Sequence, residues 1–199
     1  FANYKIQDDF LKRLAFFVEK SGYVGTLMKD EEIASLHGYN AHDYKAESLA
    51  AFFETAQSQN FQLNQSELLL RHILLENGII KTEGNKILKG EGAIISLSQE
   101  SPNYLRNSFL CHEGMHGVFF IDEDYRVYIN DLYNKTDKNS IEFIKAYFTA
   151  TPSLNYDIND DYLLKNEFMG YLVQQGVSFT SKYFSTNLAT RKGVNEKFP

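Results

Sequence analysis

The sequence has few of the residues that mark several protein classes. It contains no tryptophan, a single cysteine and three prolines among 199 residues. One cysteine cannot form a disulfide within the chain, which excludes a disulfide-stapled scaffold. The scarcity of proline and the absence of low-complexity blocks leave no obvious flexible linker, so we expect a single domain over residues 1–199.

Long hydrophobic runs and basic clusters are also missing. The longest stretch without a charged residue, 168–181, contains two glutamines and several hydroxyls. It is shorter than the roughly 20 apolar residues that a membrane span needs. The net charge is -6, with no dense group of Lys and Arg to attract phosphate backbones. We therefore expect no membrane span and no nucleic acid partner.

The chain is rich in the residues that build a folded core. Hydrophobic residues make up 43% of it and aromatic residues 15%, which excludes intrinsic disorder. The compartment is left open by the sequence. Because the sequence starts at Phe1 rather than Met, an extracytoplasmic or secreted location is favoured if Phe1 is a processed N-terminus.

Hydrophobic spacing predicts an α+β fold that is predominantly α. Helical periodicity predicts helices over residues 8–21, 43–58, 66–77, 102–121, 139–148 and 160–175. A glycine-containing connection predicts a hairpin of strands 79–82 and 86–89, and residues 92–98 read as another strand. The polar, tyrosine-rich segment 122–136 is compatible with a short strand at 126–129. The expected organisation is a mostly helical N-terminal part, residues 1–90, followed by a motif-bearing core, residues 92–175.

One predicted helix carries a pattern with chemical meaning. It contains His112-Glu113-Gly114-Met115-His116, an H-E-x-x-H element. Histidines four residues apart project from the same side of a helix, so their imidazoles can share one metal ion. Neutral imidazole suits Zn²⁺, and Glu113 is displaced enough to face a metal-bound water as a general base. The pattern predicts one Zn²⁺ per chain.

Two other interpretations use the same residues. The histidines could be buried core side chains, each hydrogen-bonded to a neighbour, but Glu113 stands where zinc-hydrolase chemistry needs a base. Glu113 to His116 is also a Glu-x-x-His element, which di-iron carboxylate bundles employ in pairs. The sequence holds no second copy of that element, so the metal interpretation with a single ion is preferred.

These residues resemble the zincin metallopeptidases, whose active-site helix bears H-E-x-x-H after a sheet with an edge strand along the substrate cleft. The likeness covers roughly residues 92–175, and it implies that the strand at 92–98 lines the cleft. A later helix with Asn166-Glu167 is similar to the glutamate helix of the gluzincin branch, which implies Glu167 as the third protein ligand. The chain departs from that pattern at Tyr171, where many gluzincins carry Asp.

Asp122 competes with Glu167 for the place of third ligand. It follows His112 at the offset that metzincin-like sites use, but that geometry needs a sharp helix end, usually at Gly, where Phe119 stands. On a continuing helix Asp122 would also point away from the histidine face. Glu167 lies in a largely apolar stripe where an unpaired charge is expensive, so we favour Glu167.

Other candidates carry weaker signals. Tyr171, one helical turn after Glu167, is chosen among many tyrosines as a possible hydrogen-bond donor to the transition state or partner of a ligand. His37 and His42 bracket a turn and could contact substrate, although structural or surface roles are favoured. Cys111 is expected to be a small apolar filler rather than a thiolate ligand.

Together these features predict a zinc-dependent peptidase with a zincin-like fold that acts on a peptide or protein substrate. Two histidines and a carboxylate would hold Zn²⁺, and Glu113 would take a proton from the zinc-bound water and pass it to the leaving amine. The alternative, from a different class, is a catalytically silent binding or scaffold module that keeps the zincin-like fold.

Overall fold

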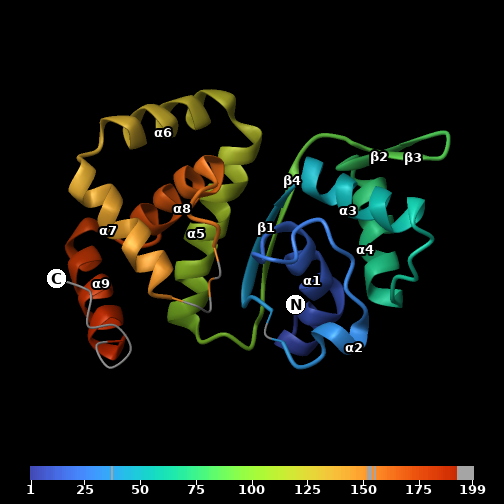
Figure 1. Ribbon diagram of the computed structural model, residues 1–199, viewed down its shortest axis with the longest axis horizontal. Helices are drawn as coiled ribbons and strands as arrows, with labels where there is room; N and C mark the ends of the chain where they lie inside the picture. The colour runs from blue at the N-terminus through green and yellow to red at the C-terminus, as the bar shows by residue number, and fades with distance from the viewer. Residues whose placement is uncertain (37, 152–153, 155, 192–199) are drawn as a thin grey trace.

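The structure, a computed structural model, describes residues 1–36, 38–151, 154 and 156–191. It is α+β and mostly helical, which confirms the fold class at this level (Figure 1). The elements in chain order are α1 (Tyr4–Val18), α2 (Asp30–Ile33), β1 (Ala41–Lys45), α3 (Ala46–Ser58), α4 (Gln65–Glu76), β2 (Ile80–Glu83), β3 (Lys86–Lys89), β4 (Ala93–Leu97), α5 (Asn103–Ile121), α6 (Glu123–Lys135), α7 (Lys138–Thr149), α8 (Asp161–Val173) and α9 (Val177–Arg191).

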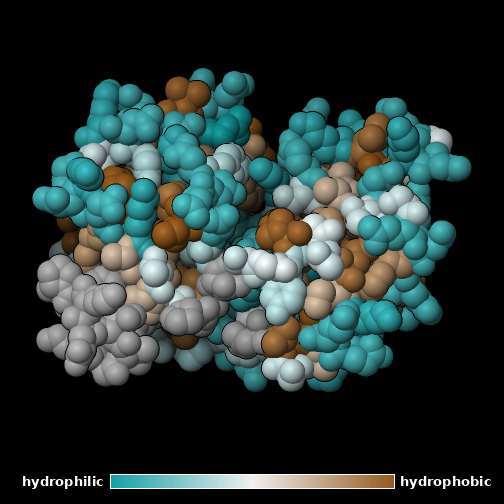
Figure 2. All heavy atoms as spheres, viewed as in Figure 1, coloured by the Kyte–Doolittle hydropathy of each residue, from teal (hydrophilic) through white to brown (hydrophobic). Residues whose placement is uncertain are grey.

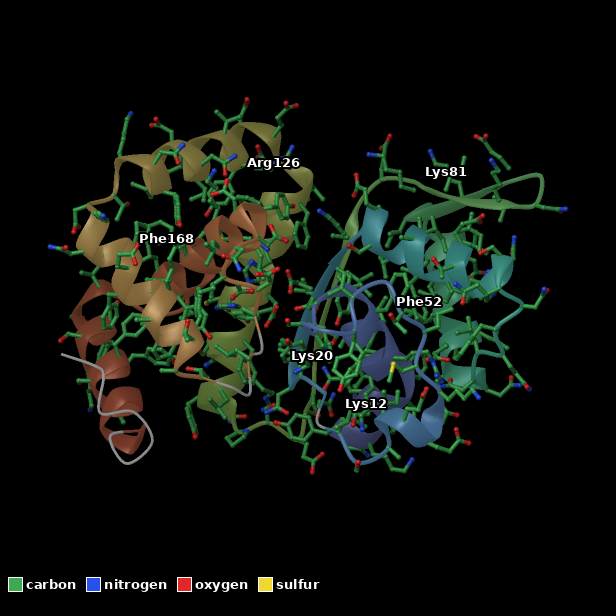
Figure 3. All side chains as sticks on the ribbon, in the orientation of Figure 1. Lys12, Lys20, Phe52, Lys81, Arg126 and Phe168 are labelled. Carbon is green, nitrogen blue, oxygen red and sulfur yellow. The ribbon has the colours of Figure 1, made fainter. Side chains whose placement is uncertain are left out.

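The chain is arranged in two halves with the β1–β4 sheet between them. Figure 1 shows α1 to α4 and the β2–β3 hairpin on the right and α5 to α9 on the left. Phe52 lies among the helices of the right half and Phe168 among those of the left half (Figure 3). Within the described ranges, buried hydrophobic side chains form one cluster in the first half and two in the second. Each half therefore has a hydrophobic core of its own.

Local sequence explains where the helices begin. The side chains of Asn3, Asn64, Asp122, Asp137 and Asp160 each accept a hydrogen bond from a backbone N–H in the first turn of α1, α4, α6, α7 and α8. Such caps satisfy backbone donors that have no partner inside the helix, and each is worth about 1 kcal/mol. The turn at Gly78, with φ 69, ends α4 in a conformation that glycine adopts without strain.

The expected helix over 43–58 is wrong at its beginning. Residues 41–45 form strand β1, which pairs antiparallel with β4 so that Asp43 lies opposite Ile95, and α3 starts only at Ala46. Alternation along the strand buries His42 and Tyr44 on one face and turns Asp43 to the other. The expected strand at 92–98 and the hairpin are confirmed, with β4 over Ala93–Leu97 and β2 paired with β3.

The expected strand at 126–129 is also wrong, because these residues belong to α6. Arg126 Nη1 donates hydrogen bonds to the carbonyl oxygens of Phe119 at 2.8 Å and Phe120 at 3.1 Å, at the end of α5. Through Arg126, labelled in Figure 3, α6 thus binds carbonyl oxygens at the C-terminal end of α5. Helix α6 also buries Ile129. Helix α9 has no counterpart among the expected elements.

The surface is consistent with inward-facing cores. In the face drawn in Figure 2, hydrophilic residues cover most of the rim of the right half and the upper rim of the left half. Among the described residues, no helix combines the length and the apolar character that a bilayer crossing requires.

Candidate metal centre

Helices α5 and α8 bring the sequence-predicted ligands together. His112 and His116 lie one turn apart on α5, and their ring centroids are 4.5 Å apart. Glu167 lies on α8, which packs against α5. The three side chains are buried, with exposed fractions of 8% for His112, 0% for His116 and 4% for Glu167.

The spacing of their polar atoms fits a small cation. Glu167 Oε2 lies 3.4 Å from His112 Nε2, and Glu167 Oε1 lies 3.8 Å from His116 Nε2. One ligand atom from each residue lies within 4.8 Å of the others. A tetrahedral ion with bonds of about 2.0 to 2.1 Å keeps its ligand atoms about 3.4 Å apart. The donor set is therefore close to the size that Zn²⁺ requires.

Buried polar atoms without partners support the same interpretation. Both ring nitrogens of His116 and Oε2 of Glu167 are inaccessible to solvent and have no hydrogen-bond partner. Such atoms usually cost about 1 to 3 kcal/mol each, so native structures rarely leave them unsatisfied. A bound cation would satisfy His116 Nε2 and the Glu167 carboxylate at once. The residues therefore fit a metal ion.

The charge state of Glu167 suits ligation. Burial by itself would raise the pKa of the Glu167 carboxyl group. The positive charge of His116 comes next in size, and together with His112 and the Tyr156 hydroxyl it holds the pKa of Glu167 below its ordinary value. This place therefore stabilises an ionised carboxylate next to a positive charge, and a bound cation would supply that charge when the imidazoles are neutral.

Glu113 lies beside the candidate ligands. It is 7% exposed, and its carboxyl group lies within 4.8 Å of Asp43 and His116. Burial raises the pKa of Glu113 well above its ordinary range, and the negative charges of Asp43 and Glu167 raise it further. A cation bound nearby would oppose that rise, because it favours the ionised form.

A cavity opens onto these side chains. It measures about 230 Å³, and its lining includes His112, Glu113, His116 and Glu167. Tyr39, Tyr156, Tyr171 and Tyr183 also line the cavity, together with Phe109, Leu154 and Gln174. A small chemical group that enters the cavity can thus reach these side chains.

Tyr171 reaches the cavity as a packing residue. Its ring packs edge to face on His112, with centroids 5.1 Å apart at an interplanar angle of 88°. It also contacts the rings of Tyr147 and Phe148 in the core of the second half. Its predicted hydrogen bond to a transition state stays a prediction, and Tyr156, whose hydroxyl faces Glu167, is an equally placed donor.

Sequence reasoning missed residues that shape the site. Gln174 Oε1 lies 3.2 Å from His112 Nδ1, where it can accept the ring proton. Gly170 lies three residues after Glu167 on α8 and faces both imidazoles. Asp43 of β1 approaches His116 Nδ1, with its Oδ2 at 4.0 Å. The H-E-x-x-H spacing contains no signal for any of them, because none belongs to α5: Gly170 and Gln174 lie on α8 and at its C-terminal end, and Asp43 lies on β1.

Other sequence candidates lie away from the ligands. Asp122 caps α6 by accepting a hydrogen bond from the N–H of Tyr125, 2.9 Å away. Cys111 is exposed, so the expectation of an apolar filler is wrong. His42 is buried with Nδ1 3.0 Å from Ser96 Oγ, as a structural role predicts. His37 lies outside the described residues.

The cleft strand differs from the one that the resemblance implied. The strand residues that line the cavity are Ala41, His42 and Asp43 of β1, and residues of β4 are not part of the lining. The β4 strand lies beside β1 in the same two-stranded sheet and packs against α5 without lining the cavity. The implied role of residues 92–98 is therefore taken by β1, of which only the part from Asp43 onward was predicted to be helical.

Comparisons with known proteins do not extend the assignment. No protein-family model, no curated protein and no solved structure matches the chain.

Proposed function

We propose that this protein is a zinc-dependent peptidase with a zincin-like fold of the gluzincin kind. The observation that carries the proposal is the convergence of buried His112, His116 and Glu167 at one cavity, with Glu113 beside them. This is the donor set of a catalytic rather than a structural zinc site, since three protein ligands leave a fourth position open. When bound, zinc would polarise a substrate carbonyl and acidify a water molecule.

The residues of the chain have separate tasks in this proposal. His112, His116 and Glu167 hold the ion, and their burial keeps competing water away from it. Glu113 accepts a proton from the attacking water and returns it to the nitrogen of the leaving amine, so one carboxylate serves both half-reactions. Tyr156 and Tyr171 line the same cavity and are the candidate donors to the oxygen that becomes negative.

The second candidate function is a silent binding or scaffold module that retains the metal. The size of the cavity favours it to some degree, since about 230 Å³ lies below the usual range for small-molecule sites of about 300 to 1,000 Å³. The burial of Glu113 next to the ligands favours the enzyme, because a silent module has no use for an acidic group there.

Comparison of the wild type with Glu113→Gln tests the proposal. Both proteins should bind about one Zn²⁺ per chain, and only the wild type should cleave members of a broad peptide library. The amide keeps the volume but cannot accept the proton, and general-base assistance is typically worth about 10² to 10⁴ in rate. Glu123→Gln, on the exposed start of α6, is the matched control.

Two results would contradict the proposal. A wild type without zinc after reconstitution excludes the metalloenzyme. A zinc-loaded wild type that cleaves nothing in the library favours the silent module.

A further inference from the structure

His116 has a second ring nitrogen that a single metal ion does not use. Its Nε2 faces Glu167, whereas Nδ1, on the other side of Cε1, points in a different direction, toward Asp43. The residue has no exposed surface, and Nδ1 therefore cannot be satisfied by bulk water. A neutral imidazole that ligates through Nε2 carries its proton on Nδ1, and this proton needs an acceptor.

The carboxylate of Asp43 stands where that acceptor is needed. Asp43 Oδ2 lies 4.0 Å from His116 Nδ1, and a shift of about 1 Å brings the pair to hydrogen-bond length. The Asp43 side chain is only 13% exposed, and its other close polar neighbour is the carboxyl group of Glu113, within 4.8 Å. Its approach comes from β1, a different element from the helices that carry the ligands.

Strand β1 holds Asp43 in a fixed direction. The strand pairs with β4 along its whole length, and its neighbouring side chains point the other way. On that face His42 Nδ1 lies 3.0 Å from Ser96 Oγ and 3.2 Å from Gln7 Nε2, and Tyr44 is 1% exposed. These contacts anchor the strand in the first half, so the position of Asp43 is set by packing rather than by a mobile loop.

Asp43 could instead belong to a second cation site, since Asp43, Glu113 and His116 also have ligand atoms within 4.8 Å of one another. His116 would then have to bind ions through both nitrogens and lose its only ring proton. That requires an imidazolate, which is far more costly than a hydrogen bond from the neutral ring. The hydrogen-bonded arrangement therefore takes precedence.

We propose that Asp43 is a positioning residue of the metal centre, whose carboxylate accepts the Nδ1 proton of His116 and directs Nε2 toward the metal. The inference rests on the proposed zinc site and adds the group that orients one of its ligands. Partners of this kind fix the tautomer of a ligating histidine, and their loss typically weakens metal binding by about 10- to 100-fold.

Zinc titration of the wild type, Asp43→Ala and Asp43→Asn tests the role. Asp43→Ala should weaken zinc binding by about 10- to 100-fold, whereas Asp43→Asn should weaken it less, because its amide oxygen still accepts the proton. If Asp43→Ala does not fold, the zinc affinity of Asp43→Asn still tests the positioning role. Tyr44→Phe, on the opposite face of the same strand, is the matched control and should bind zinc like the wild type.

Two further measurements separate positioning from other roles. Every variant should bind one metal ion, and the cobalt(II)-loaded forms should keep the same visible spectrum, since the ligand atoms do not change. Without metal, Asp43→Asn should melt close to the wild type, because its amide can keep the hydrogen-bonding contact with Glu113. A residue needed only for folding would lower the melting temperature of the metal-free protein.

The outcomes distinguish this inference from the proposed function. A wild type that binds no zinc overturns both. A zinc-binding wild type with unchanged affinity in Asp43→Ala overturns the positioning role alone. A changed cobalt spectrum, or two ions per wild-type chain, makes Asp43 a ligand and also overturns it.

Discussion

Gly170 of α8 lies directly against the imidazole of His112. A Cβ atom at position 170 would stand 2.7 Å from Cε1 and 2.9 Å from Nε2 of His112, and 2.9 Å from Cε1 of His116. Real Cβ contacts are essentially never that short, so a side chain there would displace one or both rings. The close approach of α8 to α5, and with it the place of Glu167, therefore depends on glycine.

Substitution of Gly170 should weaken the metal site more than the fold. Overpacking costs about 1 to 3 kcal/mol, so Gly170→Val should weaken zinc binding by about 5- to 150-fold, and Gly170→Ala by less. Isothermal titration with zinc measures the change. Gly114→Val on α5 is the control, because a Cβ there meets nothing within 4 Å. Equal zinc affinity in the wild type and Gly170→Val would contradict the packing argument.

The two candidate third ligands can be separated by substitution. Glu167→Ala should remove most zinc binding, since it leaves two imidazoles and a hole where the carboxylate was. Asp122→Ala should keep zinc and lose only a helix cap, about 1 kcal/mol of stability. Metal analysis and chemical denaturation of both variants measure these effects. Full zinc occupancy in Glu167→Ala, with loss in Asp122→Ala, would reverse the assignment.

Zinc should stabilise the protein in a pH-dependent way. At a free zinc concentration about 100 times the dissociation constant, binding to the native state adds about 2.7 kcal/mol to the free energy of unfolding. Imidazoles must be neutral to ligate, so zinc affinity should fall as the pH drops through the range near 6.5 where free histidine is protonated. Thermal melts with zinc and with a chelator, at pH 7.5 and 5.5, check both parts. Equal melting temperatures with zinc and with a chelator at pH 7.5 would contradict the prediction.

His42 should make the fold sensitive to acid. Burial, together with the positive charge of Lys20, lowers the pKa of His42 to about 3. In the unfolded chain its pKa is about 6.5, so between these values only the unfolded state binds the proton. The free energy of unfolding should then fall with pH below about 6.5, by up to about 1.4 kcal/mol per pH unit from this residue.

Urea denaturation of the wild type and His42→Gln between pH 7 and 4.5 measures that contribution. The variant should be less stable at pH 7, because contacts with Ser96 and Gln7 are lost, but its stability should depend less steeply on pH. His72→Gln, whose imidazole is exposed on α4, should follow the wild type. Parallel pH profiles for the wild type and His42→Gln would exclude His42 as the source.

Sequence reasoning named the candidate site residues that lie on single helices. His112, Glu113 and His116 follow from a four-residue spacing, and Glu167 follows from a carboxylate in an apolar stripe. The place of Asp43 beside His116 could not be predicted, because the residues around Asp43 resemble the acidic start of a helix. In the structure they form strand β1 by pairing with β4. Local propensity cannot report a pairing with residues so distant along the chain.

The same limit explains the errors in the fold. The segment 122–136 looks polar because α6 buries little more than Ile129 and is held by its caps and by Arg126. Gly170 gives no sequence signal either, since its role is defined by rings on another helix. The general class follows from composition and periodicity, whereas the alignment of α5, α8 and β1 depends on tertiary contacts.

The order of the elements along the chain has a consequence for biosynthesis. Strands β1 and β4 and the histidines of α5 all precede residue 122, whereas Glu167 belongs to one of the last helices. In a chain emerging from the ribosome, β1 can pair with β4 and hold Asp43 in place before Glu167, the proposed third ligand, has been synthesised. A product interrupted before Asp161 would contain Glu113 and both imidazoles but lack Glu167. On the proposed function, the ability to retain zinc would be acquired late in synthesis, when α8 docks on α5.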